Sequence, residues 1–228
     1  MEPEQNEFQQ GKTLLLNKPK TWTSFDVVNK IRYAIPGKVK VGHAGTLDPL
    51  ATGLLIICTG KHTKKLADFM GMEKEYTGII QLGETTPSYD LETEADQTFD
   101  ISHITEVMIH ETAKKFTGTL LQYPPIFSAI KQKGIPIHRL ARKGKAVKTE
   151  AREVEITKFE VTKIDLPEVH FRVVCSKGTY IRSLAHDFGK ALGAGAYLKE
   201  LTRTRIGVYK LQDAWELEDF VNLVKQQQ

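Results

Sequence analysis

The spacing of apolar residues predicts a helix near the start of the chain. Its apolar stripe consists of Val27, Val28, Ile31 and Ala34, which recur at helical intervals. Thr23 and Asp26 lie just before this stripe and have the T-x-x-D spacing of a capping box. We therefore expect a helix over 24–34.

The clearest strand and the clearest helix follow one another in the second half of the chain. Apolar and polar residues alternate over 169–175, which is typical of a strand with one buried face. After a short Lys-Gly-Thr turn, the residues over 181–192 carry an i, i+3, i+4, i+7 apolar stripe that ends at Gly193. The pattern thus predicts a strand joined to a helix.

Shorter patterns complete the expected fold. They predict strands over 39–41 and 76–82, helices over 104–116 and 217–224, a loop over 42–53, and an acidic, solvated loop or edge over 84–100. The apolar run over 54–58 is either a central strand or a buried helical turn, and its length favours the strand. Helices and strands do not alternate regularly, and no repeat is visible. We therefore expect an α+β fold with a largely antiparallel mixed sheet flanked by helices.

The chain is expected to form one domain. No linker of proline, glycine or serine divides its 228 residues. Residues 1–11 are polar and predict a disordered N-terminal tail, so the domain is expected over 12–228, with an inserted arm at about 122–152.

Composition limits the class of protein. With 40% hydrophobic and 26% charged residues, the chain has ordinary globular usage. The longest apolar run, 54–58, is far too short to cross a bilayer, and the start lacks a signal peptide pattern, which favours a cytoplasmic protein without a membrane partner. Cys58 and Cys175 lie in apolar strands without metal-ligand spacing, so we expect reduced, buried thiols and no metal.

Positive charge is concentrated in one segment. The net charge of the chain is only +4, but nine basic and three acidic residues lie between Lys131 and Lys158, a surplus of six. Such a surplus in 28 residues favours a polyanionic partner.

The sharpest chemical feature is the stretch GHAGTLDPLATG, residues 42–53. Its three glycines permit tight turns, and Pro49 keeps Asp48 out of the helical region. An aspartate in such a loop is usually a turn former, so spacing alone does not assign it a function.

Four motifs in order resemble the TruB family of bacterial tRNA pseudouridine synthases. They are the Asp48 loop, Leu16-Asn17-Lys18-Pro19 with Thr23-Ser24, Lys74-Glu75-Tyr76, and Ser176 to Leu184 with the sequence SKGTYIRSL. The similarity extends over roughly 13–209. A pseudouridine-synthase-like core is what this resemblance implies.

The resemblance also implies a reaction. Asp48 would be the nucleophile that attacks a flipped-out uridine, by resemblance U55 of the tRNA T loop, and the uracil would be detached, rotated and rejoined through carbon without a cofactor. Arg182 matches the arginine that pairs with this aspartate and favours its ionised form. Tyr76 matches the tyrosine that stacks on the base and is a candidate for the final proton removal.

Further residues are expected to bind the substrate by the same resemblance. His43 would support the RNA loop, and Tyr180, Leu201 and Lys18 would belong to the uridine site. The basic segment resembles an RNA-clasping thumb, whose candidate contacts are Arg142, Lys143 and Lys145. Lys199, Arg203 and Arg205 suggest a second basic edge.

The sequence departs from the family in three respects. Phe127 and His138 stand at thumb positions that are often tyrosine. Thr21 stands where the first motif usually has glycine, and the chain stops at Gln228, where a typical member continues into a PUA-type RNA-binding domain. We therefore expect a short enzyme that acts as a monomer on the T-arm stem-loop. The alternative is a non-catalytic RNA-binding or tRNA-folding protein that keeps the base-flipping pocket.

Overall fold

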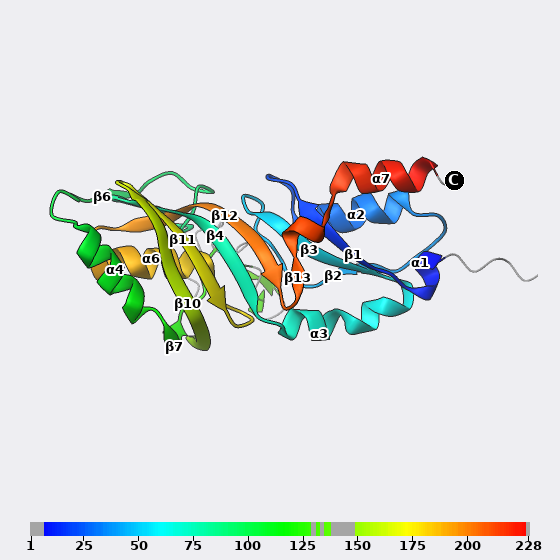
Figure 1. Ribbon diagram of the computed structural model, residues 1–228, viewed down its shortest axis with the longest axis horizontal. Coiled ribbons are helices and arrows are strands. Elements are labelled where there is room, and N and C mark those ends of the chain that lie inside the picture. Colours follow the sequence, from blue (N-terminus) through cyan, green and yellow to red (C-terminus); the bar gives the residue numbers. More distant parts are fainter. Residues whose placement is uncertain (1–6, 129–130, 133–134, 138–148, 227–228) are drawn as a thin grey trace, which may run out of the picture. The chain divides into compact units, whose positions relative to one another are not determined.

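The chain folds into two compact units, which are described separately. The computed structural model describes residues 7–128, 131–132, 135–137 and 149–226. Unit 1 comprises Met1–Tyr76 and Leu201–Gln228, and unit 2 comprises Thr77–Glu200 (Figure 1). Both boundaries fall inside strands, β4 (Lys74–Leu82) and β12 (Ala196–Ile206), so no linker-like composition marks them. This is why the sequence indicated a single domain.

Unit 1 contains a mixed sheet and its helices. In chain order its further elements are α1 (Glu7–Gln10), β1 (Thr13–Lys18), α2 (Ser24–Ala34), β2 (Val41–His43), β3 (Thr52–Thr59), η1 (Gly60–Lys65), α3 (Leu66–Gly71), β13 (Tyr209–Lys210), η2 (Leu211–Asp213), β14 (Trp215–Glu216) and α7 (Leu217–Gln226). Strand β3 pairs antiparallel with β1 and β2 and parallel with the end of β12, and β1 pairs parallel with β14. The sheet is therefore mixed.

Strand β3 is the centre of unit 1. All side chains from Leu54 to Cys58 are fully buried, because alternate residues enter two different cores. Leu55 and Ile57 pack with α2 and α7, which lie side by side, whereas Ile56 and its alternating neighbours pack with Phe69 of α3 (Figure 1). A strand buried on both faces reads as a continuous apolar run. The predicted strand is confirmed and extends to Thr52–Thr59.

Helix α2 has the predicted bounds and the predicted cap. Thr23 Oγ1 accepts from the Asp26 backbone N–H at 3.1 Å, and the Asp26 carboxylate accepts from the Thr23 backbone N–H at 2.8 Å. These two bonds satisfy donors that a helix start leaves open. Hydrogen bonds from Thr23 also lower the pKa of Asp26.

Two details of unit 1 differ from the sequence pattern. Residues Glu7–Gln10, which were expected in a disordered tail, form α1, and Phe8 is buried in the core. The buried Phe8 ring and an ion pair between Glu7 and Lys12 hold this segment, whereas residues 1–6 lie outside the described ones. The short strand expected over 39–41 is instead β2, because pairing with β3 begins at Val41 opposite Thr59.

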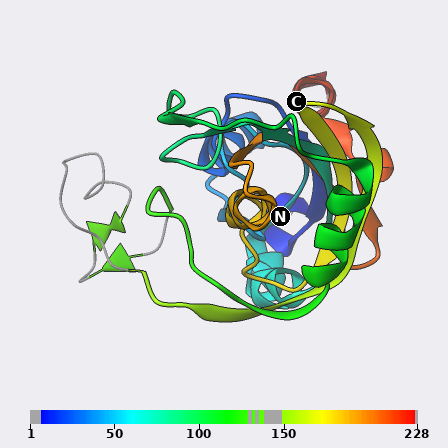
Figure 2. The same cartoon turned by 90° about the vertical axis from the view of Figure 1, so that its left-hand side faces the viewer.

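Unit 2 has an antiparallel sheet that carries two helices. Its elements are the end of β4, β5 (Glu84–Thr85), β6 (Gln97–Thr98), α4 (Glu106–Lys115), β7 (Gly118–Gln122), β8 (Lys131–Gln132), β9 (Ile135–Pro136), β10 (Arg152–Asp165), β11 (Glu168–Cys175), α6 (Ile181–Leu192) and the start of β12. Strands β4, β11, β10 and β7 are neighbours in that order. Helix α4 packs on β10 and α6, and Figure 2 shows β10 and β11 curving past α6.

The predicted strand–helix pair is confirmed in unit 2. Strand β11 covers 168–175, and α6 runs from Ile181 to Leu192 before Gly193, which adopts the left-handed conformation with φ 69°. The antiparallel pairs β10–β11 and β10–β7, with the mixed sheet of unit 1, confirm the α+β prediction. Cys58 and Cys175 are buried and are not joined in a disulfide, as expected.

The acidic stretch over 84–100 was wrongly predicted to be solvated throughout. It contains the β5–β6 hairpin, and Thr86, Ser88 and Asp90 are buried. The hydroxyls of Thr86 and Ser88 donate to the Asp90 carbonyl at 2.7 and 3.1 Å. Internal hydrogen bonds thus let a polar sequence lie inside the protein.

Candidate functional site

The Asp48 loop joins β2 to β3 and is fixed on both sides of Asp48. The Leu47 N–H donates to Ser24 Oγ at 2.9 Å, and the Pro49 carbonyl accepts from the Thr21 N–H at 2.8 Å. The Asp48 carbonyl accepts from the Ala51 N–H at 3.1 Å. The Asp48 side chain is half-buried, so a carboxylate reaches the surface from a backbone that is held in one place.

Lys18 contacts the backbone of this loop, and its side chain has no exposed surface. Its ammonium donates to the carbonyls of Trp22 at 2.6 Å, Pro19 at 2.9 Å and Pro49 at 3.3 Å. The expectation that Lys18 binds substrate needs correction, because its three bonds go to backbone carbonyls and its side chain is enclosed. Lys18 positions the loop.

The enclosure of Lys18 should be visible in the pH dependence of stability. Burial lowers its pKa from 10.5 to about 8, although the nearby Asp48 charge acts in the opposite direction. Between pH 8 and 10.5 the unfolded chain therefore holds a proton that the folded chain has lost, so stability from this group rises with pH. At roughly 1.4 kcal/mol per pKa unit, the rise is about 3 kcal/mol.

We expect the difference in unfolding free energy between wild type and Lys18→Met to grow in favour of wild type as the pH rises through this window. Urea unfolding at pH 7, 8, 9 and 10 measures it. Lys61→Met, at an exposed lysine of η1, serves as the control and should show no such trend. A constant difference for Lys18→Met would contradict the enclosed ammonium.

Arg203 holds the other side of the loop. It is 1% exposed, and its guanidinium donates to the Leu54 carbonyl at 2.7 Å and the Gly45 carbonyl at 3.2 Å. Its backbone also passes so close to Gly53 that a Cβ there would lie 2.4 Å from the Arg203 carbonyl oxygen. Only glycine permits this approach, and Gly53 also has φ +107°.

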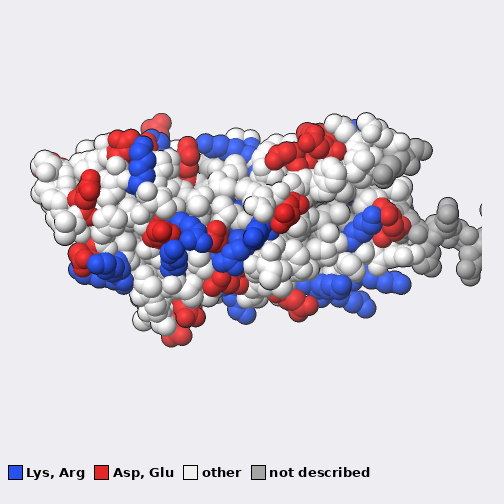
Figure 3. Space-filling model, viewed as in Figure 1, with Lys and Arg blue, Asp and Glu red and all other residues white. Residues whose placement is uncertain are grey.

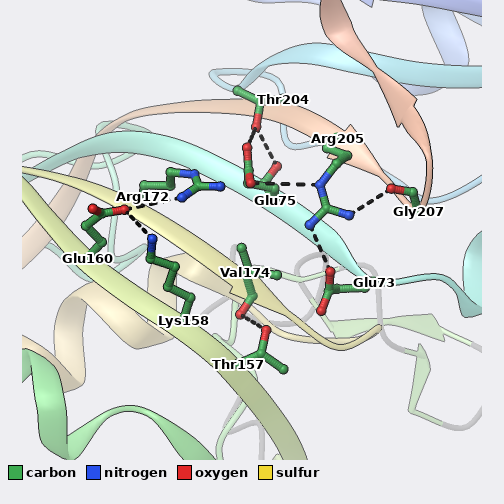
Figure 4. A network of polar contacts seen from close by, with 10 residues as sticks. All are labelled: Glu73, Glu75, Thr157, Lys158, Glu160, Arg172, Val174, Thr204, Arg205 and Gly207. Carbon is green, nitrogen blue, oxygen red and sulfur yellow. Dashed lines mark hydrogen bonds and ion pairs between the residues drawn. The ribbon is translucent and has the colours of Figure 1, made fainter.

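The predicted second basic edge is therefore wrong. Arg203 is buried, and Arg205 bonds to Glu73 at 2.8 Å and to the Gly207 carbonyl at 2.7 Å (Figure 4). In unit 2, Lys199 pairs with Glu168 at 2.5 Å. These cations are committed to partners within the protein, which a linear sequence does not reveal.

His43 lies at the end of β2, at the entry to the loop. Its side chain is half-buried, and burial lowers its pKa, while the Gly45 backbone raises it and the Arg203 charge lowers it further. The imidazole is accordingly neutral at pH 7. A neutral ring suits packing against a base better than ion pairing with a phosphate.

Thr21 explains why the first motif usually has glycine. Its φ is +71°, a left-handed conformation that is strained for a β-branched residue. The strain is tolerated because the Thr21 N–H donates to the Pro49 carbonyl.

We expect Thr21→Gly to raise the unfolding free energy by about 1 kcal/mol, since relief of left-handed strain exceeds the entropy cost of glycine. Chemical denaturation measures the change. Thr117→Gly, at an exposed threonine that is not among the positive-φ residues, should lower stability. A loss of stability in Thr21→Gly comparable to that of the control would contradict the strain.

Two further predicted residues of unit 1 lie on strands. Tyr76 is a buried residue of β4, and Leu201 is a half-buried residue of β12. Glu75 precedes Tyr76 on β4 and ties this strand to β12, because its carboxylate accepts from the Thr204 hydroxyl at 2.9 Å (Figure 4). Both side chains are thus carried by regular, rigid elements.

In unit 2, Arg182 lies in the first turn of α6 and is 3% exposed. Its guanidinium donates to the Ser88 carbonyl at 3.1 Å and the Phe127 carbonyl at 3.0 Å, and its Nε lies 3.5 Å from Asp90 Oδ2. Contacts from three sides fix the plane of the guanidinium. Ser88 and Asp90, two buried residues of a segment that the sequence pattern placed in solvent, supply two of these contacts.

Tyr180 is the residue just before α6, as the motif predicted. Its backbone N–H donates to Gln122 Oε1 at 2.7 Å, and its carbonyl accepts from Gln122 Nε2 at 3.0 Å. The Arg152 guanidinium lies 5.0 Å from the centre of its half-buried ring. Gln122 is a positioning residue that no sequence motif indicated.

The basic arm is described only in part. Strands β8 and β9 form a short hairpin, which Figure 2 shows apart from the other strands of unit 2. The candidate contacts Arg142, Lys143 and Lys145 lie outside the described residues. Positive side chains also gather along η1 and α3 of unit 1 (Figure 3), where Lys61, Lys64 and Lys65 are exposed.

The described residues contain no group of three or more histidine, cysteine, aspartate or glutamate side chains arranged to hold a metal ion. No helix in this part of the chain is long and apolar enough to cross a membrane.

Comparison with known proteins matches nearly the whole chain. Residues 32–181 match the TruB family pseudouridylate synthase N-terminal domain, and residues 182–228 match the tRNA pseudouridylate synthase B C-terminal domain. A tRNA pseudouridine synthase B of Flavobacterium johnsoniae is 56% identical, covering 96% of this chain and 98% of the relative. Its counterpart in Phocaeicola vulgatus is 50% identical, covering 97% and 96%.

Solved structures with the same fold are larger. A chain of a Cbf5–Nop10–Gar1 complex superposes with a TM-score of 0.72 at 32% identity, covering 94% of this chain and 54% of that one. A chain of an H/ACA ribonucleoprotein bound to a substrate RNA containing 2′-deoxyuridine gives 0.70 at 29% identity, covering 94% and 53%. This chain spans about half the length of each.

Proposed function

This chain belongs to the TruB family of pseudouridylate synthases, and from that premise we propose that it isomerises a uridine of tRNA, U55 of the T loop, with Asp48 as nucleophile. The observation that carries the proposal is the Asp48 loop. Its carboxylate is half-buried on a backbone fixed by Lys18 and Arg203, both enclosed. A preorganised group of this kind is what nucleophilic catalysis requires.

In the proposed reaction an Asp48 oxygen forms a bond to the ribose carbon C1′ as the bond from C1′ to uracil N1 breaks. The uracil turns, its C5 bonds to C1′ and the bond to Asp48 breaks. Loss of the C5 proton to a base and uptake of a proton at N1 then restore the aromatic ring, so that the product is an isomer of the substrate. Two easier steps thus replace one hard displacement, and the protein needs no cofactor.

The other site residues have proposed roles that follow the family resemblance. Arg182 keeps the nucleophilic carboxylate ionised, and its fixed guanidinium suits that role. Tyr76 stacks on the uracil and is the candidate for the final proton transfer, while Tyr180 and Leu201 enclose the base. His43 packs against the RNA loop as a neutral ring.

RNA would be held through its phosphates by the basic arm. We expect replacement of Arg142, Lys143 and Lys145 by alanine to weaken binding across RNA sequences and to lower the salt dependence. The plot of the logarithm of the binding constant against the logarithm of salt concentration has a negative slope. Its magnitude should decrease by about 2 to 3, since each lost phosphate contact removes about 0.7 to 0.9. Affinity titrations at several salt concentrations measure it.

The control for this prediction replaces three exposed lysines elsewhere, Lys115, Lys210 and Lys225, with alanine. Their loss should change the slope by less than one. Equal slopes for wild type and the arm variant would mean that the arm does not contact RNA.

The experiment that tests the proposed function is incubation of the full chain with an unmodified T-arm transcript, followed by mapping of pseudouridine at each position. We expect product at one loop uridine, and none in a transcript that has cytidine there. Tight binding without product at any uridine would instead support the alternative, a protein that binds or folds tRNA without modifying it.

A further inference from the structure

Unit 2 contains a cavity of about 430 Å³ at the C-terminal end of α6. We call it the α6 cavity. The residues of its wall used below are Thr85, Tyr89, Asp96, Phe99, Ile126, His186 and Lys190. Its volume is in the range of small-molecule sites. Arg182 is not part of its lining, so the cavity is separate from the contacts that fix that residue.

The wall of the α6 cavity is aromatic. The rings of Tyr89 and His186 are stacked with centroids 3.9 Å apart and an interplanar angle of 17°. The Phe99 ring lies so close to Gly195 that a Cβ there would be 2.4 Å from it. The two rings stack on each other and form one flat aromatic surface, on which a further planar ring can stack.

The backbone at Tyr89 is strained to hold this wall. Tyr89 has φ +63°, and its conformation is maintained by hydrogen bonds from its N–H to the Thr86 carbonyl at 3.1 Å and from the Leu198 N–H to its carbonyl at 2.9 Å. Residues held in such conformations concentrate at binding sites.

The polar groups of the cavity are of both signs. The carboxylate of Asp96 and the ammonium of Lys190 are on exposed residues, and Asp96 Oδ1 accepts from the Thr85 hydroxyl at 2.7 Å. His186 lines the same cavity. Its pKa is lowered by burial and by the Lys190 charge, against the opposing effect of Asp96, so that its ring is neutral at pH 7. Among the described residues, His186 Nδ1 is buried without a hydrogen-bond partner.

We propose that the α6 cavity binds a nucleobase that carries both an exocyclic amino group and a ring carbonyl, that is, cytosine or guanine, at a place separate from the reacting uridine. The aromatic wall would stack on the base, as protein aromatics do on unpaired bases. Asp96 would accept from the amino group, and Lys190 would donate to the carbonyl.

Other ligand classes fit the same groups less well. An aliphatic ligand would offer no hydrogen bond to Asp96, Lys190 or His186, and a bare phosphate would face the Asp96 carboxylate. Uracil would offer Asp96 only its N3–H, which is flanked by two carbonyl oxygens that repel a carboxylate. The base can reach the cavity as part of an RNA or as a free nucleotide, and the experiments below separate the two sources. The RNA source rests on the proposed function, whereas binding of a free nucleotide does not.

The first experiment titrates the full chain, labelled in its histidine and tyrosine rings, with CMP, GMP and UMP and follows the spectra by NMR. We expect CMP or GMP to shift the His186 and Tyr89 signals with an affinity at least fivefold above that of UMP. The double variant D96N, K190Q should lose this preference. The double variant E94Q, K115Q, at exposed residues outside the lining, should keep it. No shift with CMP and GMP, or equal shifts with UMP, would overturn the proposal.

A second variant guards against a change in fold. Ile126→Trp places a large ring at the exposed rim without altering either charge. We expect it to abolish the CMP or GMP shifts while the remaining spectrum is unchanged. Undiminished binding in this variant would show that the nucleotide lies elsewhere and would overturn the assignment to the cavity.

The source of the base is decided with T-arm RNAs in which each loop base is replaced in turn by an abasic site. If the base belongs to the RNA, one replacement should weaken binding at least fivefold in wild type and have no effect in D96N, K190Q. If every replacement acts equally on both proteins while CMP or GMP binds, the ligand is a free nucleotide. Pseudouridine mapping on the same RNAs reports separately on the proposed function, because neither Asp96 nor Lys190 is assigned a part in the reaction.

Discussion

Asp48→Asn should abolish pseudouridine formation while RNA affinity stays within a few-fold of wild type. The substitution keeps the size of the side chain, and the loop remains held because its anchors contact the backbone of Leu47 and Pro49. It removes the negative charge that the proposed attack on C1′ requires. We expect the single-turnover rate to fall by at least about a thousandfold, or about 4 kcal/mol of activation free energy.

The matched control is Asp68→Asn, which removes the same charge from an exposed position in α3 of the same unit. Its rate and affinity should equal those of wild type. Rates and binding are measured on one T-arm transcript at one salt concentration. If Asp48→Asn turned over at a rate comparable to wild type, Asp48 would not be the nucleophile, although family membership would stand.

The elements that the sequence predicted well are those whose signal is local. The bounds of α2 follow from its apolar stripe and from the Thr23 capping box, and α6 ends where Gly193 can adopt a left-handed conformation. The all-apolar run of β3 was ambiguous between strand and helix by period alone. Its short length favoured a strand, and the structure confirms that. The run is apolar throughout because both faces of β3 are buried.

The anchors of the site were not predictable in the same way. Lys18 and Arg203 are long cations that usually lie at the surface, and their sequence neighbours give no sign of burial. Their acceptors are backbone carbonyls distant in sequence, such as Pro49 for Lys18 and Gly45 for Arg203. Because every residue has a backbone carbonyl, no sequence motif indicates which carbonyl a buried lysine or arginine will bind.

The candidate chemistry was predictable only through resemblance. Asp48, Tyr76 and Arg182 belong to motifs that match the family in order, whereas composition and spacing alone left Asp48 as a turn residue. The structure adds what holds Arg182: Ser88 and Asp90 contact it and are buried, and the Thr86 and Ser88 hydroxyls both donate to the Asp90 carbonyl. The pattern of an acidic, irregular segment gave the opposite expectation.

Arg182→Lys should inactivate the enzyme almost as strongly as loss of the nucleophile. Lysine keeps the positive charge, but one ammonium cannot replace a planar fork that donates to the Ser88 and Phe127 carbonyls and lies against Asp90. The Ser88 and Phe127 carbonyls would then lose their donors. The positive charge would also move away from the position in which, by our proposal, it favours the ionised form of Asp48. We expect the single-turnover rate to fall by about a hundredfold or more, about 3 kcal/mol, with RNA affinity within a few-fold of wild type.

The control for this prediction is Arg172→Lys in the same unit, where a half-buried arginine on β11 bonds to Glu160 at 3.3 Å beside Lys158 (Figure 4). An ion pair near the surface tolerates the exchange, so its rate should change less than threefold. Binding and rate are to be measured separately for both variants, with urea unfolding to show that each is folded. If Arg182→Lys weakened RNA binding in proportion to its loss of rate, Arg182 would be a phosphate contact, and its proposed action on the Asp48 carboxylate would be wrong.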